Sequence, residues 1–132
     1  MDYNILAQKA VDAKSLAVPT YSNFPVGAAL LAENDKIYTG CNIETSSYSL
    51  TICAERTAVF KAISEGERNF KAIAVAGNTK DFLSPCGACR QVISDLCGNI
   101  DVIMVNSKNE IKSEKLSKLL PSAFGKDDLN NC

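Results

Sequence analysis

The feature that most constrains the fold is an alternation of short apolar runs with helical segments in the middle of the chain. The runs "KAIAVAG" (71–77) and "DVIMVN" (101–106) are typical of buried strands, and "CGACRQVISDLC" (86–97) between them indicates a helix. Right-handed crossovers place such consecutive strands side by side in one sheet. The alternation therefore predicts an α/β fold.

The flanking segments extend this alternation on both sides. The other expected elements are a helix over 3–17, a β-hairpin of strands 26–32 and 36–42, a helix over 53–66, a weak strand near Ile111 and a short helix over 113–120. Pro19 lies beyond the first helix, and Gly66 supplies the stop of the second. We expect a three-layer α/β/α sandwich with a central mixed sheet of about five strands.

Chain length and charge narrow the possible functions. A chain of 132 residues fits a single domain spanning 1–132, and it buries enough surface to need no disulfide staples. Its 14 lysines and arginines are scattered and matched by 15 acidic residues, which gives a net charge of −1. Nucleic-acid-binding domains carry a basic stripe. A polynucleotide partner is therefore disfavoured, and a small molecule is favoured.

The N-terminus "MDYNILAQKA" lacks the basic start and apolar run of a signal peptide. No stretch approaches the roughly 18 apolar residues that cross a membrane. We therefore expect a cytoplasmic protein without a membrane partner, in which thiols stay reduced.

Six cysteines in a chain without histidine are the main chemical signal. Cys53 and Cys86 each open an expected helix, and Cys89 follows Cys86 by one helical turn on the same face. If both helices start at the same edge of the sheet, the three thiols meet. The Cys86-x-x-Cys89 pair alone is ambiguous, since half a zinc site, a redox pair or two ordinary buried residues would fit. A redox pair would leave Cys53 and Glu55 unexplained.

The combination is more specific than its parts. Cys-x-Glu at one helix start and Pro-Cys-x-x-Cys at the next match the zinc deaminase signature in its three-cysteine form. Three protein ligands leave a tetrahedral zinc one open position for water, which marks a catalytic site. Three thiolates give the site a net charge of −1, and two helix N-termini, each worth about +0.5, would offset part of it. Arg56 and Arg90 could donate hydrogen bonds to sulfur and offset more.

Three longer segments carry a family resemblance: "CNIE" (41–44), "TICAERTAVFKAISEG" (51–66) and "SPCGACRQVISDL" (84–96). They resemble the homotetrameric cytidine deaminases of pyrimidine salvage, and the match runs from about "YSNFPVGAAL" to "LLPSAFG". The resemblance implies that Cys53, Cys86 and Cys89 hold one zinc ion per chain and that Glu55 is the general acid and base. Glu55 would take a proton from the zinc-bound water, which attacks the amino-bearing ring carbon. Cytidine, and 2′-deoxycytidine through its 3′-hydroxyl, would leave as uridine or deoxyuridine and ammonia.

The resemblance also implies a nucleoside-binding set. Phe24 would pack on the pyrimidine ring, Asn42 and Glu44 would hold the ribose hydroxyls, and the backbone of Ala54 would approach the base. Tyr48 and Phe124 would reach the sites of neighbouring subunits, so a homotetramer with shared active sites is expected.

The chain departs from the common family pattern at a few positions. Thr45 and Ser49 lie in the loop before the zinc helix, where they bear on substrate affinity. Cys41 and Cys97 are interpreted as core thiols, and Cys132 has no interpretation.

Two alternatives stay open at this point. One is a deaminase of another aminopyrimidine nucleoside such as blasticidin S, although the intact "CNIE" favours a ribose-holding site. The other is a non-catalytic zinc or redox protein. A structural zinc site would need a fourth ligand, which only a spare cysteine could supply.

Overall fold

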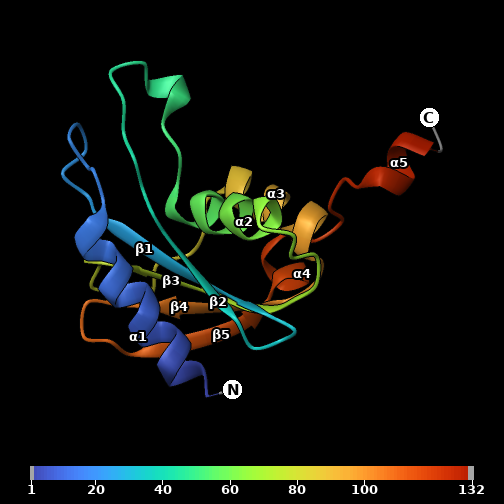
Figure 1. Ribbon diagram of the computed structural model, residues 1–132, viewed down its shortest axis with the longest axis horizontal. Coiled ribbons are helices and arrows are strands. Elements are labelled where there is room, and N and C mark those ends of the chain that lie inside the picture. The colour runs from blue at the N-terminus through green and yellow to red at the C-terminus, as the bar shows by residue number, and fades with distance from the viewer. Residues whose placement is uncertain (1, 131–132) are drawn as a thin grey trace.

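The computed structural model describes residues 2–130, in which a five-stranded sheet lies between helices (Figure 1). The helical elements are α1 (Tyr3–Ala13), η1 (Lys14–Leu16), η2 (Tyr48–Leu50), α2 (Ala54–Ser64), α3 (Gly87–Cys97), α4 (Leu116–Leu119) and α5 (Lys126–Asn130). The strands are β1 (Val26–Ala32), β2 (Ile37–Cys41), β3 (Phe70–Gly77), β4 (Asp101–Val105) and β5 (Ile111–Lys115).

The sheet is mixed and has the strand order β2-β1-β3-β4-β5. β1 pairs antiparallel with both β2 and β3, and β5 pairs antiparallel with β4. β3 and β4 are parallel neighbours joined through α3, as the crossover rule predicts for the two apolar runs. The start of β1 therefore lies beside the ends of β2, β3 and β4, and the long loops emerge at this edge.

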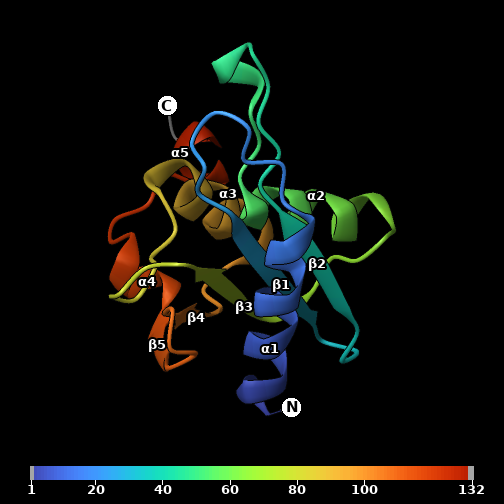
Figure 2. The same cartoon turned by 90° about the vertical axis from the view of Figure 1, so that its left-hand side faces the viewer.

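Helices cover both faces of the sheet (Figure 2). On one face, the buried Leu6 and Ala10 of α1 share a core cluster with Leu31, Ala74 and Ile103. On the other face, α2 and α3 pack over a second buried cluster formed by Leu30, Ala58, Val59, Ile73, Ile93 and Val102, among others. The three-layer α/β/α sandwich predicted from the sequence is confirmed.

Glycines let the helices approach the sheet closely. A Cβ atom added at Gly27 would lie 2.0 Å from the carbonyl oxygen of Ala10 in α1. A Cβ added at Gly40 would lie 2.5 Å from the carbonyl oxygen of Ala54 and 2.6 Å from the backbone nitrogen of Ala58. The first turn of α2 therefore rests directly on the backbone of β2.

The structure differs from the expected elements near both ends of the chain. The first helix is α-helical only to Ala13 and continues as the 3₁₀ turn η1. The predicted helix over 113–120 is wrong in its first half, because Ser113–Lys115 pair with β4 and only Leu116–Leu119 are helical. The backbone hydrogen bonds between β5 and β4 outweigh the helical preference of this segment, because a helix of so few residues is only weakly stable. Helix α5 was not predicted, and Cys132 lies outside the described residues.

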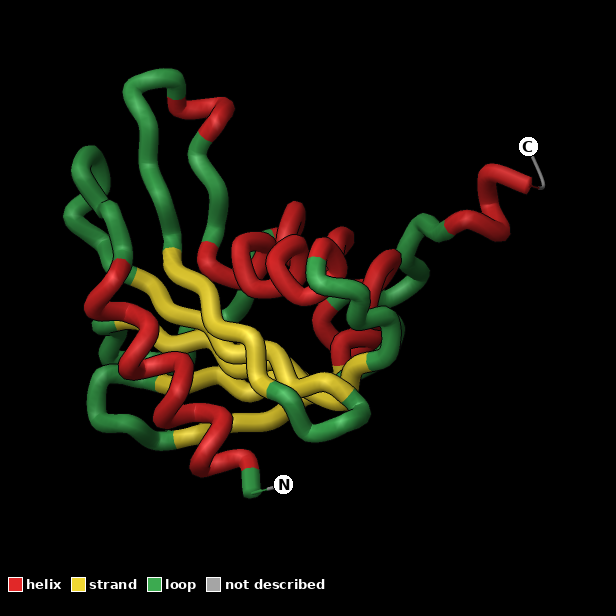
Figure 3. The backbone as a smooth tube through the Cα atoms, in the orientation of Figure 1, coloured by secondary structure: helices red, strands yellow, loops and turns green. Residues whose placement is uncertain are grey.

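Two loops project beyond the sheet edge, one between η1 and β1 and one, which contains η2, between β2 and α2 (Figure 3). Isolated bridges from Ile43 to Val18 and to Ile52 connect these loops at their base. Among residues 2–130, no helix combines the length and the apolar character needed to cross a bilayer.

Candidate active site

Three cysteine side chains meet at the loop-bearing edge of the sheet. The sulfur atoms of Cys53, Cys86 and Cys89 all lie within 4.8 Å of one another. Cys53 is the N-cap of α2, Cys86 is the N-cap of α3, and Cys89 lies one turn into α3. The two helix N-termini therefore converge as the sequence predicted, with their positive dipole ends directed at the sulfurs.

The donor set fits zinc. Thiolates are preferred zinc ligands, and a tetrahedral ion with Zn–S bonds of about 2.3 Å spaces its sulfurs by about 3.8 Å. The Sγ atoms of Cys86 and Cys89 are 3.4 Å apart, close to that spacing. The group of candidate ligands found in residues 2–130 contains these three sulfurs and no fourth donor, which is the ligand count of a catalytic zinc site.

Arg56 supplies positive charge to this cluster. Its Nη2 donates a hydrogen bond to Cys53 Sγ at 3.2 Å, as was predicted for this arginine. A hydrogen bond from Cys89, together with the Arg56 guanidinium, lowers the pKa of Cys53 to about 5, against the opposing effect of burial. The same Cys53–Cys89 hydrogen bond and burial raise the pKa of Cys89. A bound cation would stabilise all three sulfurs as thiolates.

Arg90 differs from its prediction. It was expected to donate to sulfur, but its three nitrogens donate to oxygen atoms: Nε to Pro85 O at 2.8 Å, Nη1 to Leu119 O at 2.8 Å and Nη2 to Ser84 Oγ at 2.6 Å. These bonds connect the loop before Cys86 to the end of α4. Arg90 therefore holds the loop before Cys86 in place and does not donate to a cysteine sulfur.

Glu55 lies in the first turn of α2, next to the cysteine ligand Cys53 and only 5% exposed. Burial raises the pKa of its carboxyl group, and the Cys53 thiolate acts in the same direction. A raised pKa favours the protonated carboxyl group and so makes the group better suited to hold and return a proton, which is what a general acid and base does. The interpretation of Glu55 as an ordinary solvated helix carboxylate is therefore ruled out by its burial.

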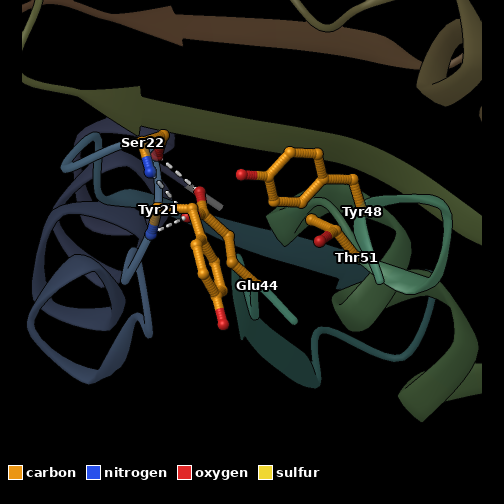
Figure 4. Close-up of a pocket in the computed structure, with 5 residues that line it drawn as sticks. All are labelled: Tyr21, Ser22, Glu44, Tyr48 and Thr51. Carbon is orange, nitrogen blue, oxygen red and sulfur yellow. Dashed lines mark hydrogen bonds between the residues drawn. The ribbon is translucent and has the colours of Figure 1, made fainter. Parts of the chain in front are cut away.

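Glu55 and two of the cysteines border a cavity of about 220 Å³. This inner cavity is lined by Val26, Asn42, Glu44, Thr51, Ile52, Cys53, Ala54, Glu55, Leu83, Ser84 and Cys86. An outer cavity of about 340 Å³ adjoins it and is lined by Tyr21, Ser22, Glu44, Tyr48 and Thr51 (Figure 4). Glu44 and Thr51 border both cavities, so the outer cavity forms the approach to the inner one.

The predicted sugar-binding residues line the inner cavity, and Glu44 borders the outer one as well. Asn42 is buried, donates from Nδ2 to Phe24 O at 2.9 Å and accepts from Val26 N–H at Oδ1 at 2.8 Å. Glu44 accepts hydrogen bonds from the backbone N–H groups of Tyr21 and Ser22, both at 2.9 Å. The structure thus brings Asn42 and Glu44 to the cavity, where both also hold the loop before β1.

Of the remaining predicted residues, Ala54 and Tyr48 line the cavities, and Phe24 and Phe124 do not. The fully buried Ala54 lines the inner cavity, and Tyr48 lines the outer one while its side chain remains 72% exposed. Phe24 is 38% exposed and lies near Gly77, outside the residues that line either cavity. Phe124 is 52% exposed and borders a separate surface groove beside α3 and α5. Within a single chain, Phe124 is therefore not part of the site.

Comparison with known proteins identifies the family of this chain. The model of the cytidine and deoxycytidylate deaminase zinc-binding region matches residues 2–106. The chain belongs to the cytidine and deoxycytidylate deaminase family.

Individual family members agree over nearly the whole chain. The cytidine deaminase of Sporosarcina psychrophila is 54% identical over 131 residues, which covers 98% of this chain and 96% of that protein. The cytidine deaminase of Halalkalibacterium halodurans is 48% identical over 132 residues, which covers 99% of this chain and 100% of that protein. The crystal structure of cytidine deaminase from Burkholderia pseudomallei superimposes with a TM-score of 0.91 at 43% identity, covering 94% of this chain and 100% of that one.

Several residues that line the two cavities were not predicted from the sequence. Thr51 borders both cavities, Leu83 and Ser84 line the inner one, and Ser22 lines the outer one. Loop residues of these types have many uses, so no local pattern marks them. Gly40 offered a usable signal, because a glycine inside a strand often marks close approach of another backbone.

Proposed function

We propose that this protein catalyses the hydrolytic deamination of cytidine and 2′-deoxycytidine to uridine or deoxyuridine and ammonia. The observation that carries the proposal is the buried Glu55 carboxyl group, which borders one cavity together with two of the three converging cysteines. Cys53, Cys86 and Cys89 would hold a zinc ion, which would activate a water molecule for attack on the amino-bearing ring carbon. Glu55 would accept one proton of that water and pass it to the adjacent ring nitrogen. It would then take the remaining proton from the hydroxyl group added to the ring carbon and give it to the amino group, which leaves as ammonia as the carbon–nitrogen bond breaks and the carbonyl forms.

The other residues of the inner cavity bind the nucleoside. The Glu44 carboxylate accepts a hydrogen bond from a sugar hydroxyl, and the Asn42 amide donates one. The backbone of Ala54 lies beside Glu55 and contacts the base. Phe24, which lies near Gly77 and outside the residues that line the cavities, would pack on the pyrimidine ring of the bound nucleoside. Burying the base against these groups excludes water from the reacting atoms.

The charges around the cavities favour a nucleoside over a nucleotide. Among the residues that line the two cavities, Glu44 and Glu55 carry carboxylates and no lysine or arginine appears. A 5′-phosphate would enter without a cationic partner and would be repelled by Glu44. This supports a role in pyrimidine nucleoside salvage rather than in nucleotide conversion.

Assembly into a homotetramer with shared active sites is part of the proposal. Tyr48, Leu50 and Phe124 expose 72%, 71% and 52% of their surfaces, as expected for side chains that neighbouring subunits cover. Phe124 lies away from the cavity of its own chain, so it would serve the site of a neighbour. We expect activity to be lost together with the tetramer on dilution, as measured by sedimentation and assay at matched concentrations. A fully active monomer would contradict shared sites.

A cytoplasmic location completes the proposal. The cysteine ligands are free thiols, and such ligands persist in a reducing compartment.

The experiment that tests the function is the Glu55→Gln substitution. The amide has the shape of the carboxyl group but cannot exchange protons, so kcat should fall by at least ~10²–10⁴. Deamination of cytidine, deoxycytidine, cytosine and CMP would be followed through the ultraviolet change of the ring. Zinc content and the melting temperature serve as controls and should match the wild type. Near-normal turnover of the variant, or no turnover of either nucleoside by the wild type, would overturn the proposal.

A further inference from the structure

The hydroxyl group of Ser22 bonds to both Glu44 and Phe24, which lie apart in the sequence and have separate proposed roles. Ser22 Oγ donates a hydrogen bond to Glu44 Oε2 at 2.5 Å and accepts one from Phe24 N–H at 3.1 Å (Figure 4 shows the bonds to Glu44). One hydroxyl thus joins the proposed sugar-binding carboxylate to the backbone of the residue proposed to pack on the base. Asn23, between them, has a positive φ of 56°, so the turn that brings Ser22 and Phe24 together is a strained one.

The two oxygens of Glu44 are held differently. Oε1 accepts both backbone N–H bonds, from Tyr21 and Ser22, and these do not depend on any side chain. Oε2 accepts the Ser22 hydroxyl and a long contact of 3.4 Å from Asn42 Nδ2. The hydroxyl bond is therefore the short contact that determines the direction of Oε2. It is also the leading cause of the lowered pKa of Glu44, which keeps the carboxylate ionised.

We propose that Ser22 is a positioning residue that orients Glu44 toward the sugar of the bound nucleoside. This role rests on the proposed function, because it assigns Glu44 to a sugar hydroxyl. Ser22 itself is exposed and lies in a loop, and the backbone anchors of Glu44 remain when the hydroxyl is removed. The loss of the hydroxyl should therefore loosen the carboxylate without unfolding the chain.

The sugar lies away from the reacting ring carbon, so its contacts contribute similarly to the ground state and the transition state. Loss of such uniform binding raises KM and leaves kcat nearly unchanged. A hydrogen bond to a charged group corresponds to roughly a tenfold change in affinity. We expect Ser22→Ala to raise the KM for cytidine about tenfold with kcat within about twofold of the wild type.

The hydroxyl that we assign to Glu44 is the 3′-hydroxyl, because cytidine and 2′-deoxycytidine share it. The experiment compares cytidine with 3′-deoxycytidine, which lacks this group. Ser22→Ala should change kcat/KM for 3′-deoxycytidine by less than about twofold, since Glu44 has no partner there to be oriented toward. Ser22→Thr keeps the hydroxyl and should restore most of the cytidine KM. Ser107→Ala, in the exposed turn after β4, is the matched control and should behave as the wild type.

Two outcomes would contradict the role of Ser22 alone, and a third would contradict the deaminase function as well. An unchanged KM for cytidine in Ser22→Ala, or equal losses on both substrates, would overturn the assignment of Ser22 while leaving the deaminase function intact. Ser22→Gly removes the same hydroxyl and provides the same comparison if the alanine variant does not fold. A wild-type protein that deaminates no nucleoside would overturn the function itself and the role of Ser22 with it.

Discussion

Replacement of Gly40 by alanine tests whether the close contact between β2 and α2 positions the residues proposed to carry the catalysis. The added Cβ would lie 2.5 Å from Ala54 O and 2.6 Å from Ala58 N, and ordinary van der Waals contact begins at 3.4 Å. Both atoms belong to the helix backbone, so no side chain can rotate away. The first turn of α2 would have to move by roughly 1 Å.

That turn carries Glu55 and begins at Cys53, so the displacement changes the distance between the carboxyl group and the metal ligands. Overpacking of this kind destabilises a core by about 1–3 kcal/mol. A misplacement of about 1 Å in a catalytic group can reduce the rate by about 10²-fold. We therefore expect Gly40→Ala to lose about 2 kcal/mol of unfolding free energy and about 10²-fold in kcat/KM.

The measurements are urea denaturation and cytidine turnover per folded protein. Gly27→Ala is the matched control, because its Cβ would lie 2.0 Å from Ala10 O in α1, on the opposite face of the sheet. It should destabilise the fold to a similar extent and leave kcat/KM within a few-fold of the wild type. If both variants lose the same catalytic efficiency, or if Gly40→Ala is as active as the wild type, the positioning role of the β2–α2 contact is refuted.

Three further predictions follow from other contacts. Arg56→Gln removes the cation beside Cys53 Sγ and should weaken zinc affinity by about 10–100-fold in competition with a chromogenic chelator; an unchanged affinity would contradict the charge-compensating role. Removal of zinc by a chelator should lower the melting temperature and abolish activity, and both should return on adding zinc, with about 2.7 kcal/mol recovered at a hundredfold excess over Kd. Tyr3→Phe should cost about 1 kcal/mol at neutral pH, because Tyr3 donates to Asp101. That bond, with burial, raises the pKa of Tyr3 from 10.0 to about 12, so its stabilisation is present below pH 10 and is lost as the pH rises to about 12. The free energy of unfolding, measured by denaturation between pH 10 and about 12, should fall less steeply with pH in Tyr3→Phe than in the wild type.

Local spacing was sufficient for much of the site. Cys86 and Cys89 are one helical turn apart, and Cys53 and Glu55 are at the start of a helix, so their relative placement follows from helix geometry alone. The convergence of the two helix starts stayed conditional on both helices starting at the same edge of the sheet, and the strand directions in the structure meet that condition. Short-range periodicity is encoded residue by residue, which is why it could be read without a structure.

The hydrogen-bond partners of the two arginines could not be predicted from local spacing. Arg56 and Arg90 each lie immediately beside a motif residue and were interpreted alike from the sequence. In the structure Arg56 bonds to sulfur, while Arg90 is drawn to carbonyl and hydroxyl oxygens that include Leu119, far along the chain. The choice depends on which acceptors other segments bring within reach of a long, flexible side chain. No local pattern carries that information.

The sequence by itself determined the α/β layers and the placement of Cys53, Cys86, Cys89 and Glu55 at two helix starts, because these depend on apolar periodicity and on spacings of one helical turn. The roles proposed for these residues came from the zinc deaminase signature and the family resemblance. Only the tertiary structure decided that Gly40 contacts the backbone of α2, that Ser22 joins Glu44 to Phe24, and that Phe124 lies outside its own cavity. These features are contacts between segments distant in sequence. Their geometry is set by the packing of the whole core, which places backbones to within a fraction of an ångström and which no single segment encodes.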